Sequence, residues 1–203
     1  MPSSAASDVY KRQTELKDRT EKIKSEILEN QKNPEKIITV GGHLDSWDIG
    51  EGAHDDGAGC VHSIGALRLF QKQNIRPNNT IRAVMFMNEE FGLRGGLKYA
   101  EIAVRDGEQH IAAIESDASG YVPRGFGFSG SEEQLEKIQD WLKYFDINTI
   151  SYFKKGGGGA DIGPLHRQTG TPMFGLSIDG QKYFEMHLSL IHISEPTRRR
   201  GIS

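Results

Sequence analysis

The sequence predicts an α/β domain built on a mostly parallel sheet. Short β-branched runs alternate with segments whose apolar residues repeat at helical spacing, and polar residues stand where the predicted strands end. Strands that alternate with helices along a chain are typical of βαβ units, whose strands run parallel.

Four strands and three helices are expected between residues 36 and 178. Each expected strand is short and rich in β-branched residues, and each expected helix has apolar residues three or four positions apart. The expected strands are 36–40, 80–87, 110–116 and 171–178, and the expected helices are 57–73, 93–105 and 132–145. Ser131 is expected to cap the last helix. The charged segment 14–29 leads in as a strand or a helix.

The two ends of the chain carry traces of one DNA element. With one choice of codons for residues 8–13 (DVYKRQ), the reverse complement encodes Leu-Ser-Leu-Ile-His-Ile, which is residues 188–193. Folding constraints do not produce this relationship, whereas the transposase end of a sequencing-library adapter does. We therefore expect residues 1–13 and 188–203 to be adapter-derived, and residues 14–187 to be a natural domain incomplete at both ends.

Composition excludes several kinds of partner and site. The chain has 25 Lys and Arg against 28 Asp and Glu, a net charge of −3, and no basic tract lies between the two end segments, so no nucleic-acid partner is expected. No apolar run approaches the roughly 20 residues of a membrane-spanning helix. Cys60 is the single cysteine, which excludes an intrachain disulfide and a cysteine-based zinc site.

Polar residues follow the first three predicted strands. His43 follows the first strand and Asp117 follows the third. The adjacent Glu89 and Glu90 follow the second. Because ligands bind beyond the carboxyl ends of the strands in open α/β sheets, these side chains are expected to converge at one edge of the sheet.

Two pairs of adjacent acids are hard to explain structurally. Glu89 and Glu90 repel each other, and burial at the end of a strand adds a desolvation cost. A divalent cation removes both costs, since one Glu can ligate it while the other acts as a base. Asp55 and Asp56 stand at the expected start of a helix, where a capping role explains one of them but hardly both. Asp117 also reads as a turn residue that ends a strand.

Histidine and carboxylates without a thiol form a donor set that suits zinc or a similar divalent ion. Taken alone, His43 is better explained as a packed or surface residue. Asp45, two residues further on, is placed to accept the second N–H of His43 and orient its ring. A carboxylate shared by two metals about 3.5–4 Å apart would form a co-catalytic pair.

Five motifs together resemble the di-zinc exopeptidases of metallopeptidase family 28, in particular a carboxypeptidase branch with bacterial relatives. They are GGHLDSWDIGEGAHDDGAG, MFMNEEFGLRGGLKYAE, IESDASG, GGGADIGPL and DGQKYF, which occur in this order over most of 35–187. The resemblance implies a three-layer α/β/α architecture, in which residues 14–187 are a partial zinc-peptidase catalytic domain.

The resemblance also implies metal ligands. His43 and Asp117 would hold one zinc ion, and Asp55 would bridge both ions. Glu90 would ligate the second zinc, and Asp45 would orient His43. The implied cofactor is therefore two zinc ions in the parent protein.

Glu89 is implied as the general base, which takes a proton from the attacking water and passes it to the leaving amine. The peptide between Asp55 and Asp56 is expected to be cis. Trp47, Asp48 and the loop 156–161 are expected to shape the substrate pocket, although a glycine-rich loop reads equally well as a plain turn.

The last zinc ligand of the family is expected to be missing. Relatives tend to read Tyr-Phe-x-x-His-His, with the second His as ligand, whereas here His187 is followed by adapter-derived Leu188. The second zinc site would then be incomplete and the fragment itself inactive. The alternative, in which His187 ligates, requires an alignment shift of one residue. His192 lies in the adapter-derived end and is not a functional residue.

The expected function of the parent is a zinc-dependent exopeptidase of the aminopeptidase or dipeptidase type, acting on a peptide or dipeptide. Two alternatives stay open: a glutaminyl-cyclase-like zinc acyltransferase on the same fold, and a non-catalytic peptidase-like binding module. The filled His, Asp and Glu positions argue against the binding module for the parent. The resemblance further suggests a secreted or periplasmic protein, and a homodimer is one expected partner arrangement.

Overall fold

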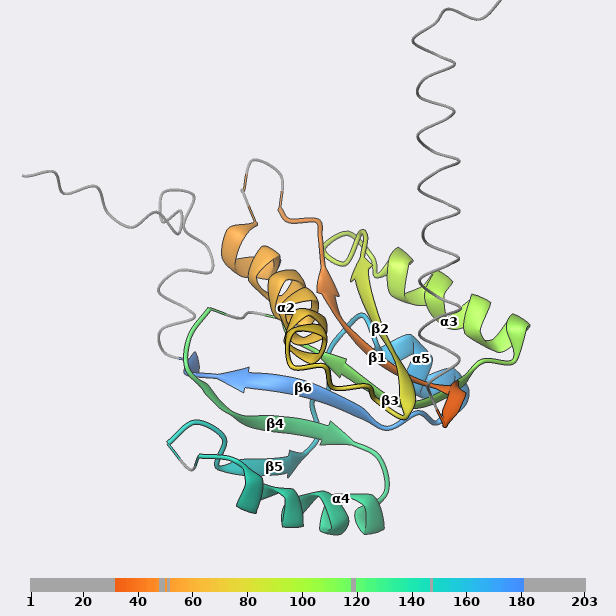
Figure 1. Cartoon of the computed structure of the whole chain (residues 1–203). Helices are drawn as coiled ribbons and strands as arrows, with labels where there is room; N and C mark the ends of the chain where they lie inside the picture. Colours follow the sequence, from red (N-terminus) through yellow and green to blue (C-terminus); the bar gives the residue numbers. More distant parts are fainter. Residues whose placement is uncertain (1–31, 48–49, 51, 118–119, 147, 181–203) are drawn as a thin grey trace, which may run out of the picture.

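The computed structural model describes residues 32–180 apart from 48–49, 51, 118–119 and 147 (Figure 1). The expected adapter-derived ends (1–13 and 188–203), the lead-in segment 14–29, Asp48, His187 and His192 lie outside these described residues. No helix in the described part is long and apolar enough to cross a membrane.

Six strands form one sheet in the order β2-β1-β3-β6-β4-β5. The sheet is mostly parallel: β2, β1, β3 and β6 run in one direction, and β4 pairs antiparallel with β6 and parallel with β5. This confirms the predicted sheet type. The strands are β1 (Asn33–His43), β2 (Asn79–Phe86), β3 (Gln109–Glu115), β4 (Pro123–Ser129), β5 (Tyr152–Lys155) and β6 (Met173–Ile178).

The predicted strands are all present, and two further strands were not predicted. In β4, Phe126 and Phe128 alternate with glycines, which lower the strand propensity of the segment. The strand β5 is only four residues long, which is too short for a recognisable period. Both strands exist because their aromatic residues pack together, a long-range effect that local sequence does not encode.

Four α-helices and two short helical turns connect the strands of the described part. The predicted helix over 132–145 is α-helical only to Gln139 and continues as a 3₁₀ turn (η2, Asp140–Tyr144). Its cap is confirmed: the Ser131 hydroxyl accepts the N–H of Gln134, and the Gln134 side chain accepts the N–H of Ser131. The helices are α2 (Ala58–Lys72), α3 (Arg94–Asp106), α4 (Glu132–Gln139) and α5 (Gly163–Thr169), and the other turn is η1 (Ala53–Gly57).

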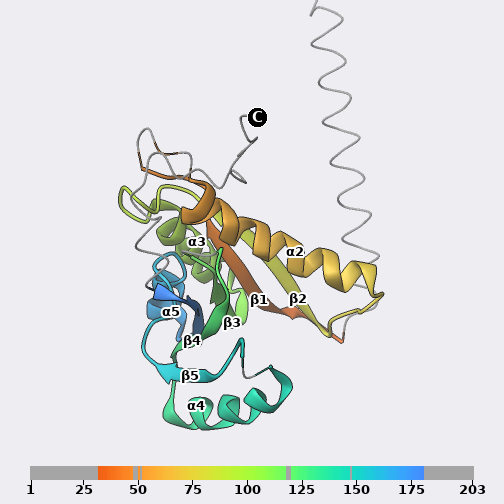
Figure 2. The same ribbon diagram turned by 90° about the vertical axis from the view of Figure 1, so that its left-hand side faces the viewer.

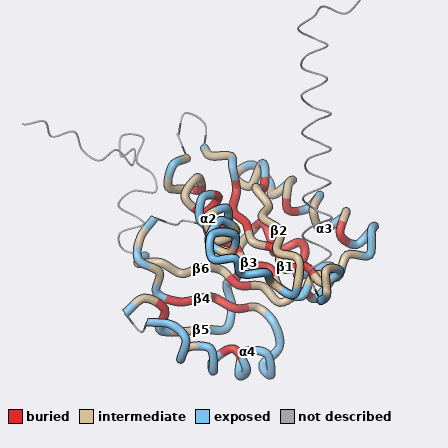
Figure 3. The backbone as a smooth tube through the Cα atoms, viewed as in Figure 1, coloured by how far each residue is buried: buried red, intermediate tan, exposed pale blue. Residues whose placement is uncertain are grey.

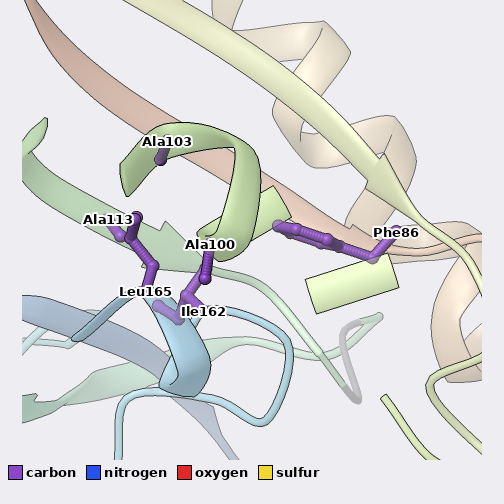
Figure 4. Close-up of a cluster of buried hydrophobic side chains, with 6 residues drawn as sticks. All are labelled: Phe86, Ala100, Ala103, Ala113, Ile162 and Leu165. Carbon is purple, nitrogen blue, oxygen red and sulfur yellow. The ribbon is translucent and has the colours of Figure 1, made fainter. Parts of the chain in front are cut away.

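The helices cover both faces of the sheet, which gives the three-layer architecture (Figures 1 and 2). Neighbouring residues of β3 point to opposite faces: Ala113 packs in one core cluster with α3 and α5, while Ile114 packs in another beneath α4. The first cluster is shown in Figure 4 and consists of Phe86, Ala100, Ala103, Ala113, Ile162 and Leu165.

The second cluster is aromatic and holds β4, β5 and β6 against α4. Phe126 stacks on Phe153 with ring centroids 5.5 Å apart, and Phe128 lies 4.9 Å from Phe174. Figure 3 shows buried segments along the middle of the sheet, whereas most of α4 is exposed. The two clusters fix the sheet, and the sheet in turn fixes the positions at which its strands end.

Candidate metal and catalytic site

The carboxyl ends of β1, β2 and β3 meet at one edge of the sheet. His43, the last residue of β1, pairs in register with Phe86, the last residue of β2. The main chain joins β1 to the end of β3 through the Ser116 N–H, which donates to the Gly41 carbonyl at 2.9 Å. The residues that follow these strands therefore converge, as the sequence predicts.

The backbone and ring of His43 are held rigidly. The residue is 1 % exposed. Its N–H donates to Asp56 Oδ2 at 3.0 Å, and its carbonyl accepts the thiol of Cys60 at 3.1 Å. Ring atom Nδ1 lies 2.9 Å from the main-chain carbonyl of Asp45, which accepts its proton and leaves Nε2 facing the site.

His43 Nε2 faces two carboxylates. It lies 3.0 Å from Asp55 Oδ1 and 3.6 Å from Asp117 Oδ1. With the ring proton on Nδ1, neutral His43 would point a lone pair at two anions, which is repulsive. A positive charge is needed between them, and either a proton or a metal ion supplies it.

The raised pKa of His43 reflects the same need for a positive charge between the carboxylates. Burial lowers this pKa, but the nearby carboxylates of Asp117 and Asp55 outweigh burial and raise it to about 12. When no metal ion is bound, the imidazole ring of His43 takes up a proton and itself becomes the cation. A divalent ion would bind where that proton sits and would leave His43 neutral.

The two glutamates lie in a turn after β2 that Asp45 holds. The Asp45 carboxylate accepts the N–H groups of Glu89 at 3.0 Å and Glu90 at 3.3 Å. Asp45 was expected to orient His43 through this carboxylate, which lies 4.0 Å from Nδ1; the hydrogen bond to the ring comes from its main-chain carbonyl instead. Asp45 thus links the histidine to the glutamate turn.

Both glutamates are destabilised as anions. Burial raises the pKa of Glu89, with Asp117 and Glu90 adding to the rise. Burial also raises the pKa of Glu90, whose side chain accepts a hydrogen bond from the Trp47 indole N–H. Trp47 was expected to shape the pocket, and its indole lies against this glutamate.

The two aspartates of the Asp55-Asp56 pair have different surroundings. Asp56 is fully buried and its Oδ1 accepts the N–H of Gly59 at 2.9 Å, which caps the start of α2. A Cβ at Gly59 would lie 1.7 Å from the Ser116 carbonyl, so only glycine fits there. Asp55 instead turns to His43. The peptide between Asp55 and Asp56 is cis, as expected.

Two groups of side chains in the described part could hold a metal ion. One consists of His43, Asp56 and Asp117, the other of His43, Asp55 and Glu90, and the ligand atoms in each group lie within 4.8 Å of one another. In the first group, Asp117 Oδ1 is buried and has no hydrogen-bond partner among the described residues. This donor set of imidazole nitrogen and carboxylate oxygen fits zinc.

Asp161 is a charged residue of this region that the sequence analysis did not assign. It was expected only as part of a pocket-shaping loop. It is 1 % exposed, and neither carboxylate oxygen has a hydrogen-bond partner within the described residues. Burial raises the pKa of Asp161 to about 7; His43 lowers it, and Glu89 and Asp117 add to the rise. These influences place it within electrostatic reach of the site.

Glu115 fixes the loop that carries Asp161. Its carboxylate is buried and accepts the N–H of Ala160 at 2.8 Å and that of Ile162 at 3.0 Å. A Cβ at Gly159 would lie 2.3–2.5 Å from this carboxylate, so the approach requires glycine. Burial raises the pKa of Glu115 to about 8. The buried role of Glu115 had one sign in the sequence, which is the position of this acid within the apolar run IAAIES.

A cavity of about 510 Å³ adjoins Asp117. Its wall includes Gly156–Gly159, where the sequence allowed either a pocket wall or a plain turn, and the structure shows a wall. The remaining lining residues are Glu115, Gly127, Lys154, Lys155, Gly175, Leu176 and Ser177.

A family model described as peptidase family M28 matches residues 26–189. The chain belongs to peptidase family M28. It is 35% identical to carboxypeptidase Q of Bos taurus over 162 residues, which is 80% of this chain and 34% of that protein. The crystal structure of a peptidase M28 precursor from Shewanella amazonensis superimposes with a TM-score of 0.70 at 30% identity, over 76% of this chain and 35% of that one.

The chain spans about a third of the length of these M28 relatives. A glutaminyl cyclase of Porphyromonas gingivalis shares the fold at 17% identity and a TM-score of 0.54, over 72% of this chain and 57% of that one. At this identity the likeness concerns the fold alone. The M28 membership and the two groups of side chains around His43 point to the same kind of site.

Proposed function

We propose that the parent protein is a zinc-dependent exopeptidase that hydrolyses a peptide bond of a peptide or dipeptide with an activated water. The observation that carries this proposal is the position of His43 Nε2 between the carboxylates of Asp55 and Asp117, where a cation is needed. The family of the chain and the names of its relatives support peptide hydrolysis.

Zinc, when bound, would polarise the carbonyl of the scissile bond and lower the pKa of the attacking water. His43 and Asp117 would hold one ion, and Asp55 would be shared with a second ion that Glu90 also holds. Asp56 supports this arrangement from behind, because its carboxylate binds the main chain at His43 and at the start of α2.

Glu89 is the residue placed to move protons. It adjoins Glu90 in the turn held by Asp45, and its raised pKa favours a group that accepts a proton and gives it up again. Glu89 would take a proton from the attacking water and deliver it to the leaving amine. His43 is buried and the carboxylates around it are partly buried, which strengthens each of these charge interactions relative to open water.

The proposal is tested by the zinc content and activity of two proteins: residues 14–187, and the same segment extended with the natural parent sequence beyond His187. We expect elemental analysis to give about one zinc per chain for the first and two for the second, with hydrolysis of aminoacyl-peptides only by the second.

Three other outcomes would change the interpretation. Two zinc ions and peptide cleavage in the 14–187 segment would identify His187 as the last ligand. Cyclisation of an N-terminal glutamine without peptide hydrolysis would favour the acyltransferase. Failure of both proteins to bind zinc would overturn the proposal.

A further inference from the structure

The cavity beside Asp117 has a floor made of main chain. It lies on the face of the sheet that carries α5, because Glu115 points there and contacts the start of that helix. On this face, β4 and β6 present Gly127 and Gly175, which leave the floor without side chains. A cavity of about 510 Å³ accommodates a dipeptide, whose two residues span about 7 Å when extended.

Two lysines line the end of the cavity formed by β5, the edge strand of the sheet (Figure 1), and they point in opposite directions. Lys155 turns toward α4, where its ammonium group pairs with Glu132. Lys154 turns the other way, and its Nζ lies 5.3 Å from the centroid of the Tyr152 ring. Tyr152 itself packs over Gly125, on the face of the cavity. Strand alternation therefore assigns Lys154 to the cavity.

The charge of Lys154 has no counterpart in the described part of the chain. No carboxylate there pairs with Lys154, whereas Lys155 is neutralised by Glu132. The other ionisable residues of the lining, Glu115 and Asp117, are acids at the edge where the metal ligands converge. The cavity is thus polarised, with acids at the candidate metal site and, at the β5 side, a cation that no carboxylate of the described residues neutralises.

We propose that Lys154 binds a free carboxylate of the substrate, carried by the residue that leaves on hydrolysis. This inference rests on the proposed peptidase function and specifies its substrate class. A peptide bond held at the metal ligands would place the next residue along the glycine floor, so that its carboxylate meets the ammonium of Lys154. The preferred substrates would be dipeptides, or peptides whose leaving residue has an acidic side chain.

Binding of three probes tests the inference without requiring catalysis. Alanyl-glutamine has a terminal carboxylate, alanyl-glutamate amide has only a side-chain carboxylate, and alanyl-glutamine amide has none. Their dissociation constants are measured by calorimetry with zinc present, in a Glu89→Gln background that prevents turnover. The Lys154→Gln variant is compared with Lys155→Gln, a matched control from the same strand.

We expect Lys154→Gln to weaken the preferred carboxylate probe about ten-fold, as for loss of one charge-assisted hydrogen bond, and to leave alanyl-glutamine amide unchanged. Lys155→Gln should change each dissociation constant by less than about two-fold, because its charge is already paired. The preferred probe identifies the source of the carboxylate: alanyl-glutamine for the terminus, alanyl-glutamate amide for the side chain.

Equal binding of the three probes, absence of binding, or equal losses in both lysine variants would overturn the inference. The proposed function has a separate readout. Hydrolysis of alanyl-glutamine amide without any preference for a carboxylate would support the peptidase function and contradict the binding of a substrate carboxylate by Lys154. If carboxylate probes bind in a way that depends on Lys154 but the extended parent chain hydrolyses no peptide, the role of Lys154 would be supported and the peptidase function contradicted.

Discussion

Two polar regions of this molecule are built from the same kinds of side chain and differ in how the charges are matched. Toward the amino ends of β2 and β3, Arg82 makes two hydrogen bonds of 2.8 Å to Glu108. His110 adds a third contact to Glu108 at 2.9 Å, and Thr39 and Tyr99 complete this paired cluster. At the carboxyl ends, acids gather around a single histidine.

The pKa values of the carboxylic acids are shifted in opposite directions in the two regions. The hydrogen bonds from Arg82 hold the pKa of Glu108 below its usual range. Burial instead raises the pKa values of Glu89, Glu90 and Asp161 at the candidate site. A cluster whose charges already match stabilises the fold. A cluster of acids that lacks a cation stabilises the fold less, but it can bind a cation. Unpaired buried charge therefore indicates a functional site better than paired charge does.

The largest expected effect separates chemistry from metal binding at the candidate site. Glu89→Gln in the extended parent chain should lower the rate of peptide hydrolysis by about 10²–10⁴-fold, because the amide cannot accept the proton. Zinc content should not change, since Glu90 and not Glu89 is the proposed ligand. The control is Glu108→Gln in the paired cluster, which should keep the rate. Loss of zinc in Glu89→Gln would show that Glu89 is itself a ligand.

A smaller effect is expected from breaking the paired cluster. Arg82→Met should lower the free energy of unfolding by about 1–2 kcal/mol, because it leaves the half-buried Glu108 without its bidentate partner. The measurement is urea unfolding at pH 7. Lys137→Met removes an exposed pair with Glu133 and serves as the control, with no measurable change expected. Similar losses in both variants would mean that the paired cluster has no special structural role.

The sequence predicts where the polar side chains converge, and it predicts four of the six strands of the described sheet. The convergence of His43, Glu90 and Asp117 could be predicted because each stands at or after the end of a recognisable strand, and parallel strands bring their carboxyl ends together. The strands β4 and β5 were missed because glycine and brevity hide their period. Their existence depends on packing between aromatic residues far apart in the sequence.

The unassigned acids were missed for a related reason. Asp161 is held near the site because Glu115, more than forty positions earlier, binds the main chain on both sides of it. No local pattern predicts that contact. The role of Asp45 was only partly predictable, since sequence indicates a carboxylate near a histidine but not whether the side chain or the main-chain carbonyl makes the hydrogen bond.

The last prediction compares the same kind of substitution in both regions of the metal-free protein. Burial raises the pKa of Asp161 to about 7, against roughly 3.9 in an unfolded chain. Between these values the folded state binds a proton that the unfolded state has lost, so the contribution of Asp161 to stability falls as pH rises from about 4 to 7. Asp161→Asn removes this loss.

Asp161→Asn should therefore match the parent near pH 4.5 and exceed its free energy of unfolding by about 1–2 kcal/mol at pH 8, as measured by urea unfolding with a chelator. Glu108→Gln should do the opposite. Because Arg82 lowers the pKa of Glu108, the stabilising charge is present at pH 8 and is lost only in acid. Destabilisation by both substitutions at pH 8 would mean that the Asp161 carboxylate is stabilised by a positive charge or by hydrogen bonds, as Glu108 is. The distinction between the two regions would then fail.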